Sequence, residues 1–424
     1  MPSPTRARGR VLVFAFLLSV ITYLDRVCIS AAAPFIMADL HLTVIEMSLV
    51  FSAFTLAYSI FEIPSGWLAD VRGPRLMLTR IVVWWSAFTM LTGAATGFRS
   101  LIAIRFLFGA GEAGAFPTVS RGFSRWFPQR ERGSANGVLF FGSRLGGMLS
   151  APVALMLIRT WGWRTAFVVF GFLGVLWAAA WYAWYRDRPS DHPGVNTAEL
   201  AWIEQDGVRS EAPGTPWRAL MASGNLYAIC AMYFAFGYGL YFYFTWLPTF
   251  LIRELGFSML AGGLLAALPF ALAGLADLAG GRLTDSLARR KGLRTARCSL
   301  GAASFLTCSV LVLLSTAAPQ PLAKAVLLAL ALASADLALG ACWAVCLDVG
   351  DAHAGVVTGF MNTFGNLGGL IGPMVVGVAV DRWHSWTFPF YVTAVVYAGG
   401  ALAWLAIDPT RKIADERTPE LRAL

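Results

Sequence analysis

The chain has 424 residues, of which 57% are hydrophobic and only 13% charged, with a formal net charge of +9. Soluble domains have about 25% charged residues, so this composition excludes an ordinary soluble protein and indicates a chain that crosses a membrane many times. The positive charge alone would also fit a nucleic-acid-binding protein, but its distribution along the chain argues against that function.

Twelve apolar segments are long enough to span a hydrocarbon layer of about 30 Å. The first follows basic residues, but no suitable cleavage site comes after it, so we interpret it as a retained helix and not as a signal peptide. We expect transmembrane helices at 11–33, 46–68, 76–97, 99–120, 134–158, 164–185, 226–252, 258–282, 297–317, 322–347, 354–380 and 386–407.

One long polar stretch, from Arg186 to Gly224, divides these segments six and six. We therefore expect an all-α membrane protein with twelve transmembrane helices in two pseudo-symmetric six-helix bundles. The predicted parts are an N-terminal bundle at 1–185, a cytoplasmic central loop at 186–225, a C-terminal bundle at 226–410 and a cytoplasmic tail at 411–424.

The basic residues orient this bundle. With the N-terminus inside, most of the 33 Lys and Arg residues fall on the cytoplasmic side, as the positive-inside rule requires. The net charge is thus a topology signal, and we expect no nucleic-acid partner. The ratio of 30 arginines to 3 lysines and the lack of a sorting signal predict a bacterial inner membrane, with both termini in the cytoplasm. The six cysteines lie mostly in apolar segments without CxxC pairs, so we expect packing roles and no metal site.

The fourth segment carries two charges, Arg105 and Glu112, inside a hydrophobic run. A charge at mid-membrane costs about 2.5–3.5 kcal/mol on insertion scales, so such residues are usually functional. Seven residues are two helical turns, which places both side chains on one face, about 10 Å apart. One turn would satisfy an ion pair better. Each charge is therefore expected to find its partner on another helix or in a ligand, and the helix to form one wall of a polar cavity.

The two halves repeat a loop. GWLADVRGPR (66–75) follows the second segment, and GGRLTDSLARRKG (280–292) follows the eighth, each with G-x-L-x-D and then basic residues. Two copies at matching positions indicate an internal duplication. We predict gating roles for Asp70, Arg75 and Asp285, with Asp70 contacting the first turn of a facing helix or one of two arginines, Arg121 and Arg125.

These paired loops resemble the signature loop of the major facilitator superfamily. The finer resemblance is to its anion:cation symporter family, which includes sugar-acid transporters and sialin. The sequence departs from that pattern at Glu62, Arg144, Asp277 and Asp336. The matching stretches are YLDR (23–26), AYSIFEIPSGWLAD (57–70), RFLFGAGEAGAFP (105–117), GWRTAF (162–167), RDRPSDHPGVNTAELAWI (186–203), YFYFTWLPTFL (241–251) and GFMNTFGNLGGLIGP (359–373).

The resemblance implies roles for the membrane charges. By it, Asp25 and Glu112 carry protons, Arg26 holds the substrate carboxylate, and Arg105 links the acids. From the residues alone, Asp25 and Arg26 could instead form a structural ion pair between helices. Further candidate substrate contacts are aromatic and amide side chains, for which helix packing is the alternative: Tyr23, Tyr58, Tyr241, Tyr243, Trp246, Asn362 and Asn366.

Arg144 has two interpretations. Gly142 and Gly146 suit close packing on a helix, and Arg144 points about 200° away from both. It could form a second anion contact across from Arg26. It could instead be neutralised by one of two aspartates, Asp277 and Asp336.

The histidines lie in loops or at segment ends, and neither G-x-S-x-G nor H-E-x-x-H occurs, so we do not expect an enzyme. Duplicated halves favour alternating access over a channel. The predicted function is a proton-coupled symporter importing a small organic anion, with a proton-driven exporter as the alternative. We expect no cofactor, H⁺ as coupling ion with Na⁺ as an alternative, and a monomer in the lipid bilayer.

Overall fold

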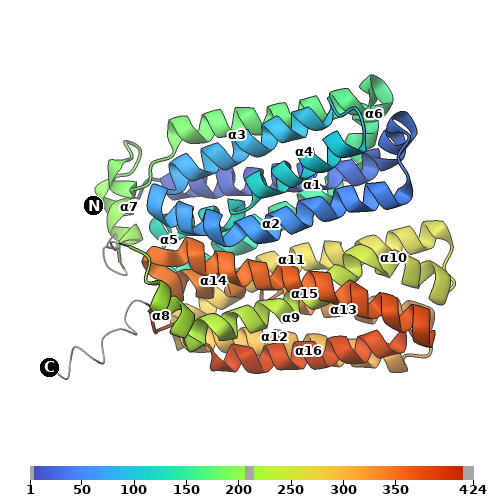
Figure 1. Ribbon diagram of the computed structural model, residues 1–424. Coiled ribbons are helices and arrows are strands. Elements are labelled where there is room, and N and C mark those ends of the chain that lie inside the picture. Colours follow the sequence, from blue (N-terminus) through green and yellow to red (C-terminus); the bar gives the residue numbers. More distant parts are fainter. Residues whose placement is uncertain (1–3, 206–213, 414–424) are drawn as a thin grey trace. The chain divides into compact units, whose positions relative to one another are not determined.

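The computed structural model describes residues 4–205 and 214–413, and these are mainly helical (Figure 1). Helices satisfy their own backbone hydrogen bonds, which is what a chain needs inside hydrocarbon. The α-helices are α1 (Ala7–Leu40), α2 (Val44–Arg72), α3 (Pro74–Thr92), α4 (Phe98–Glu112), α5 (Ala115–Trp126), α6 (Arg132–Trp184), α7 (Thr197–Ile203), α8 (Trp217–Ala222), α9 (Gly224–Thr245), α10 (Leu247–Thr249), α11 (Met259–Lys291), α12 (Leu300–Ala317), α13 (Pro321–Asp336), α14 (Leu339–Gly350), α15 (Ala354–Trp383) and α16 (Thr387–Ala406).

Eight stretches of the described helices are long and apolar enough to cross a membrane by length and composition. One of them, Pro321–Val380, is 60 residues long and contains the predicted tenth and eleventh segments. The predicted fifth and sixth segments share α6, which turns at Gly162 (φ 79°). The fold class expected from the sequence, an all-α membrane protein of twelve helices in two six-helix bundles, is confirmed by the fold relatives reported below.

The described chain forms two compact units. Unit 1 comprises Met1–Pro128, Gly142–Gly214 and Ala352–Gly359, and unit 2 comprises Gln129–Phe141, Thr215–Asp351 and Phe360–Leu424. Each unit thus includes one short segment from the other half of the sequence.

The two units repeat their turns as well as their helices. Gly73, between α2 and α3, and Gly292, after α11, both have a φ of +82°, a conformation that suits glycine. His41 and Gly256 also have positive φ, and each lies two residues before a side chain that caps the next helix. The internal duplication therefore extends to the backbone conformation of the loops.

Two predicted helices are broken near their middle. The prediction of one continuous helix over 99–120 is wrong, because α4 ends at Glu112 and α5 begins at Ala115. Gly114 between them has a φ of +88°, and a Cβ there would collide with Ser65. The tenth segment is interrupted at the corresponding place, between Asp336 and Leu339, although Leu337 and Ala338 keep negative φ. An acid is the last residue before each break.

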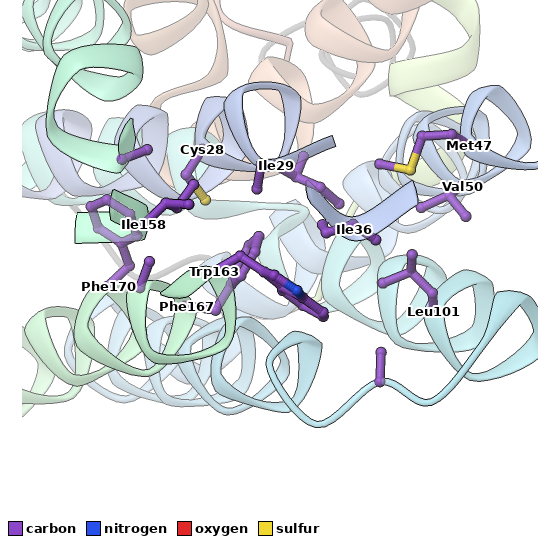
Figure 2. Close-up of a cluster of buried hydrophobic side chains, with 14 of the residues drawn as sticks. Cys28, Ile29, Ile36, Met47, Val50, Leu101, Ile158, Trp163, Phe167 and Phe170 are labelled. Atoms are coloured by element: carbon purple, nitrogen blue, oxygen red, sulfur yellow. The ribbon is translucent and has the colours of Figure 1, made fainter. Parts of the chain in front are cut away.

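An apolar cluster in unit 1 fills the space between α1 and its neighbours (Figure 2). Cys28, Ile29 and Ile36 of α1 lie beside Trp163 and other aromatic residues of α6. Cys28 comes one turn after Asp25, so this apolar cluster begins next to the predicted proton site.

The central loop is attached to the start of α1. Glu199 of α7 is fully buried, and its carboxylate accepts hydrogen bonds from the backbone N–H groups of Ala7 and Arg8, both at 3.1 Å. Thr5 donates to the same carboxylate and Asn196 caps α7. A carboxylate at a helix N-terminus satisfies free N–H groups and interacts favourably with the helix dipole. Figure 1 shows α7 beside the N-terminal end of α1.

Candidate functional site

Glu112 and Arg26 form an ion pair between α4 and α1. Arg26 donates from Nε to Glu112 Oε1 at 3.0 Å, and its Nη2 contacts the same oxygen. The expectation that Glu112 finds its partner on another helix is confirmed. The Arg26 side chain is 23% exposed and the Glu112 side chain 1%, so the guanidinium is the accessible member of the pair.

Aromatic rings surround the Arg26 guanidinium. Its central carbon lies 5.3, 5.2 and 4.8 Å from the ring centroids of Tyr23, Phe54 and Tyr58. Cation–π contacts of this kind stabilise a cation that is partly removed from water. The fold therefore brings together Tyr23, Arg26, Tyr58 and Glu112, which are four of the residues singled out in the sequence.

Asp25 and Arg105 lie behind this pair. Asp25 is 1% exposed and Arg105 2%, and both interact electrostatically with Glu112. Arg105 lies over the Phe108 ring at 4.3 Å, and neither Asp25 oxygen has a hydrogen-bond partner. Two acids in one buried site thus have different surroundings, because an arginine is bonded to Glu112 and not to Asp25. Such a site can hold a proton on one acid while the other is charged.

The candidate residues of unit 2 form a neutral group. Tyr241 donates to Asn366 Oδ1 at 3.2 Å, and Asn362 lies one turn earlier on α15. Trp246 donates its indole N–H to the carbonyl of Pro373 at 3.0 Å. The donor of Trp246 is therefore used within the protein, whereas the Tyr241–Asn366 pair can exchange its hydrogen bond for one to a ligand.

Arg144 is half-buried on α6. Its neighbours Gly142 and Gly146 pack on α1, since a Cβ at these positions would lie 2.9 Å and 2.5 Å from backbone oxygens of that helix. A hydrogen bond of 2.5 Å between Ser143 and Ser19 joins the same two helices. The predicted glycine face is confirmed, while the role of Arg144 stays a prediction.

Asp70 binds the first turn of α15. Its carboxylate accepts hydrogen bonds from the backbone N–H groups of Gly355 and Val356 at 2.9 and 2.8 Å, and Arg121 Nε lies 3.5 Å from Oδ1. Both kinds of contact expected from the sequence are present. The contact depends on a close approach, because a Cβ at Gly355 would lie 2.8 Å from Asp70 Oδ1.

Asp285 repeats this arrangement in unit 2, with α6 in the place of α15. It accepts hydrogen bonds from the N–H groups of Gly133 and Ser134 at 3.0 and 2.6 Å and pairs with Arg297 at 3.0 Å. Arg297 also binds Asp348 at 3.3 Å. Arg132 then pairs with Asp348 at 2.6 Å, so two acids and two arginines form one buried network.

Arg75 contacts the end of α6 instead of a facing helix. Its guanidinium donates to the carbonyl of Tyr182 at 2.8 Å and lies over the Tyr182 ring, and its backbone N–H donates to Asp187 at 3.0 Å. Arg125 pairs with the same aspartate at 3.5 Å. These contacts connect the first signature loop with the start of the central loop.

Several buried charges of this scaffold were not predicted from the sequence. Arg132, Arg297 and Asp348 lie at segment ends, where a charge is indistinguishable from one that only marks the cytoplasmic face.

Comparison with known proteins shows the family of the chain. The model of the Major Facilitator Superfamily matches residues 15–373. A protein named "Probable sulfoacetate transporter" from Cupriavidus necator is 34% identical, with 100% of this chain and 99% of that protein covered. The hexuronate transporter of Bacillus subtilis is 32% identical, with 93% of each chain covered. The D-galactonate transporter of Escherichia coli is 31% identical over 97% of this chain and 98% of its own length.

Among solved structures, a proton:xylose symporter of the same superfamily bound to 6-bromo-6-deoxy-D-glucose has a TM-score of 0.74. It is 14% identical, and the match covers 93% of this chain and 94% of the symporter, so the likeness concerns the fold alone. Family, relatives and fold agree with the paired signature loops and with the multi-pass membrane architecture. The chain belongs to the major facilitator superfamily and is a membrane transporter, not an enzyme.

Proposed function

We propose that this transporter is a proton-coupled symporter that imports a small organic anion by alternating access. The observation that carries the proposal is the Arg26–Glu112 pair, in which a partly exposed guanidinium is bonded to a buried carboxylate. A substrate carboxylate can reach Arg26 and replace Glu112 there. Glu112 then loses its counter-charge while buried, and a buried carboxylate without a partner favours the protonated form. Substrate binding and proton binding are thereby linked.

The substrate class we propose is an organic acid, with a preference for two acidic ends. The relatives are named for sulfoacetate, hexuronate and D-galactonate. Sulfoacetate has a sulfonate as well as a carboxylate. In this chain Arg26 would hold one anionic end and Arg144 the other. Within unit 2, the Tyr241–Asn366 pair is a separate candidate for hydrogen bonds to a polar group.

We further propose H⁺ as the coupling ion, with no cofactor, and a monomer in a bacterial inner membrane with both termini in the cytoplasm. The excess of arginine in the cytoplasmic loops supports this orientation. The alternative is a proton-driven exporter. Arg26 and Arg105 are positively charged, so they favour an anionic substrate. They would repel a cationic compound, which argues against an exporter of cationic drugs.

The test is a counterflow assay in proteoliposomes with sulfoacetate, D-galactonate and a cationic dye. We expect labelled-acid exchange, uphill uptake under an inward proton gradient, and loss of both in Arg26→Gln. Charge-assisted hydrogen bonds contribute about 1.5–3 kcal/mol, so exchange at low substrate should fall about tenfold or more. The matched control is Arg99→Gln, an exposed arginine. Dye transport without acid transport would overturn the proposal.

A further inference from the structure

The end of α4 that carries Glu112 is fixed by its neighbours. Because α4 stops at Glu112, the helix does not continue past this acid, and contacts from other helices must set its position. Helix α2 packs closely on one side of it. A Cβ at Gly109 would lie 2.5 Å from the backbone oxygen of Phe54, and a Cβ at Gly114 would lie 2.3 Å from the Ser65 side chain.

On the side of α3, the indole of Trp84 provides the corresponding contact. Its Nε1 donates a hydrogen bond of 2.9 Å to the backbone carbonyl of Leu107. A Cβ at Gly111 would lie 1.7 Å from Cδ1 and 2.4 Å from Nε1 of the same ring, so the indole lies directly on the α4 backbone. Gly111 comes immediately before Glu112. The indole therefore contacts the end of α4 at two points that are one helical turn apart.

The hydrogen bond of Trp84 is difficult to replace within the membrane. The indole N–H can only donate, and the hydrocarbon layer offers no water as an acceptor. The Trp84 side chain is 39% exposed, so a ring that left α4 would turn its N–H toward lipid. The bond to the Leu107 carbonyl thus holds the indole on α4 and holds α4 against α3.

We propose that Trp84 is a positioning residue for the Arg26–Glu112 pair, whose indole fixes the end of α4 so that the Glu112 carboxylate meets the Arg26 guanidinium. Arg26 Nε donates to Glu112 Oε1 at 3.0 Å, and a shift of about 1 Å would remove this contact from hydrogen-bond range. The inference rests on the proposed coupling through this pair, and Trp84 acts on the substrate only through it.

The inference predicts changes in two quantities. In the proposed function, a substrate carboxylate must replace Glu112 at Arg26. A looser pair is easier to displace, so the KM for substrate exchange should fall. Glu112 then responds less to the arrival of the substrate, so accumulation under a proton gradient should also fall. A general loss of folded transporter would reduce exchange and accumulation together and would not lower the KM.

The test compares two substitutions on the two sides of the contact. Trp84→Phe keeps an aromatic ring and removes the donor, whereas Gly111→Ala adds a Cβ that collides with the indole. The control is Trp177→Phe, which removes a bond of the same kind elsewhere in unit 1, since Trp177 Nε1 donates to the Phe14 carbonyl at 3.0 Å. The measurements are the KM of labelled sulfoacetate or D-galactonate exchange in proteoliposomes and uptake under an inward proton gradient.

We expect Trp84→Phe and Gly111→Ala each to lower the KM of exchange about threefold and accumulation about fivefold, as the loss of one neutral hydrogen bond implies. Trp177→Phe should match the wild type. A double variant tests whether the two positions act together. In a Trp84→Ala background, Gly111→Ala should have no further effect, because the ring with which its Cβ collides is absent.

An unchanged or raised KM in Trp84→Phe would overturn the inference, and so would the same changes in Trp177→Phe. An additive effect of Gly111→Ala in the Trp84→Ala background would place the effect in α4 itself. If neither single variant reaches the membrane, the contact serves folding and the inference is wrong. The proposed function fails separately, namely if the wild type shows no proton-driven uptake.

Discussion

The aspartates of the two signature loops bind a helix N-terminus in the same way, but they have different numbers of charged partners. Asp70 in unit 1 accepts two backbone hydrogen bonds and has one arginine at 3.5 Å. Asp285 in unit 2 accepts two backbone hydrogen bonds and belongs to a buried network with Arg297, Asp348 and Arg132. A contact built on one loosely placed arginine is easier to release than one built on a closed network. We therefore expect the loop of unit 1 to open more readily and the loop of unit 2 to contribute more to stability.

The two units also differ in the partners of a buried acid within the membrane segments. Glu112 ends α4 beside an arginine, and Asp336 ends α13 near the phenols of Tyr243 and Tyr397. The two acids occupy corresponding positions in the two halves of the sequence, but different side chains surround them. Coupling is thus expected to depend on the surroundings of an acid and not on its place in the fold.

The largest effect is expected when the two buried acids, Glu112 and Asp336, are compared by substitution. Glu112→Gln should abolish proton-driven accumulation and leave exchange of labelled substrate, because a neutral amide mimics the protonated acid. Asp336→Asn should still accumulate substrate. The measurement is uptake into proteoliposomes with and without a pH gradient. Accumulation by the Glu112 variant would exclude Glu112 as a coupling site, and its loss in both variants would extend coupling to unit 2.

The next largest effect is expected for Asp70 in the first signature loop. Asp70→Asn should lower the transport rate about tenfold while substrate binding changes little, since a charge-assisted bond worth about 1.5–3 kcal/mol is lost from one conformation only. Equal loss of binding and transport would indicate misfolding instead.

Arg297→Met should act on stability. It leaves the carboxylates of Asp285 and Asp348 buried without their shared arginine, and breaking a buried ion pair costs about 3–5 kcal/mol. Thermal unfolding in detergent should show a larger loss for this variant than for Asp70→Asn, which removes one acid from a pair and not the arginine shared by two acids. If the two variants lose equal stability, the loops do not differ as described.

A moderate effect is expected at Arg144. If Arg144 binds a second anionic end, Arg144→Gln should raise KM for a diacid about tenfold more than for a monoacid of the same length, as loss of one charge-assisted hydrogen bond implies. Initial rates of uptake for the two acids provide the measurement. A change that is equal for both acids would place Arg144 in the scaffold.

The smallest effect concerns the central loop. His192 is 6% exposed between the rings of Trp126 and Trp184, and its Nδ1 accepts a hydrogen bond from the Gly194 N–H at 2.9 Å. Burial, followed by the nearby Arg186, lowers the pKa of His192 below its usual value. A lowered pKa means that the folded state binds the proton less readily than the unfolded one. Docking of the loop should therefore weaken as pH falls below about 6.5.

Limited proteolysis at several pH values measures this docking. His192→Phe keeps an aromatic ring and should remove the pH dependence, whereas His384→Gln, at an exposed position, should not. Persistence of the pH dependence in His192→Phe would assign it to another group.

The fold class and the paired loops could be predicted from the sequence, because repeated loop motifs have few alternative explanations. The sequence also singled out the buried acids and arginines of unit 1, because charged residues are rare inside apolar segments. It could not predict that Arg26, rather than Arg105, bonds to Glu112, since partners on different helices depend on helix rotation. The helix break after Glu112 was also missed. Gly114 has a positive φ and leaves no space for a Cβ beside Ser65, and this close approach joins positions far apart in the sequence.

The attachment of Glu199 to the start of α1 has a consequence for biosynthesis. Glu199 lies 192 residues after Ala7, whose N–H it accepts. At about 5–20 residues per second, the ribosome needs roughly 10–40 s to make the chain between them. During that interval the first helix is already available for insertion while its leading N–H groups lack their protein acceptor. The contact between α7 and the start of α1 can therefore form only after translation has passed the polar stretch, so this last attachment of the first helix comes after all six N-terminal segments have been made.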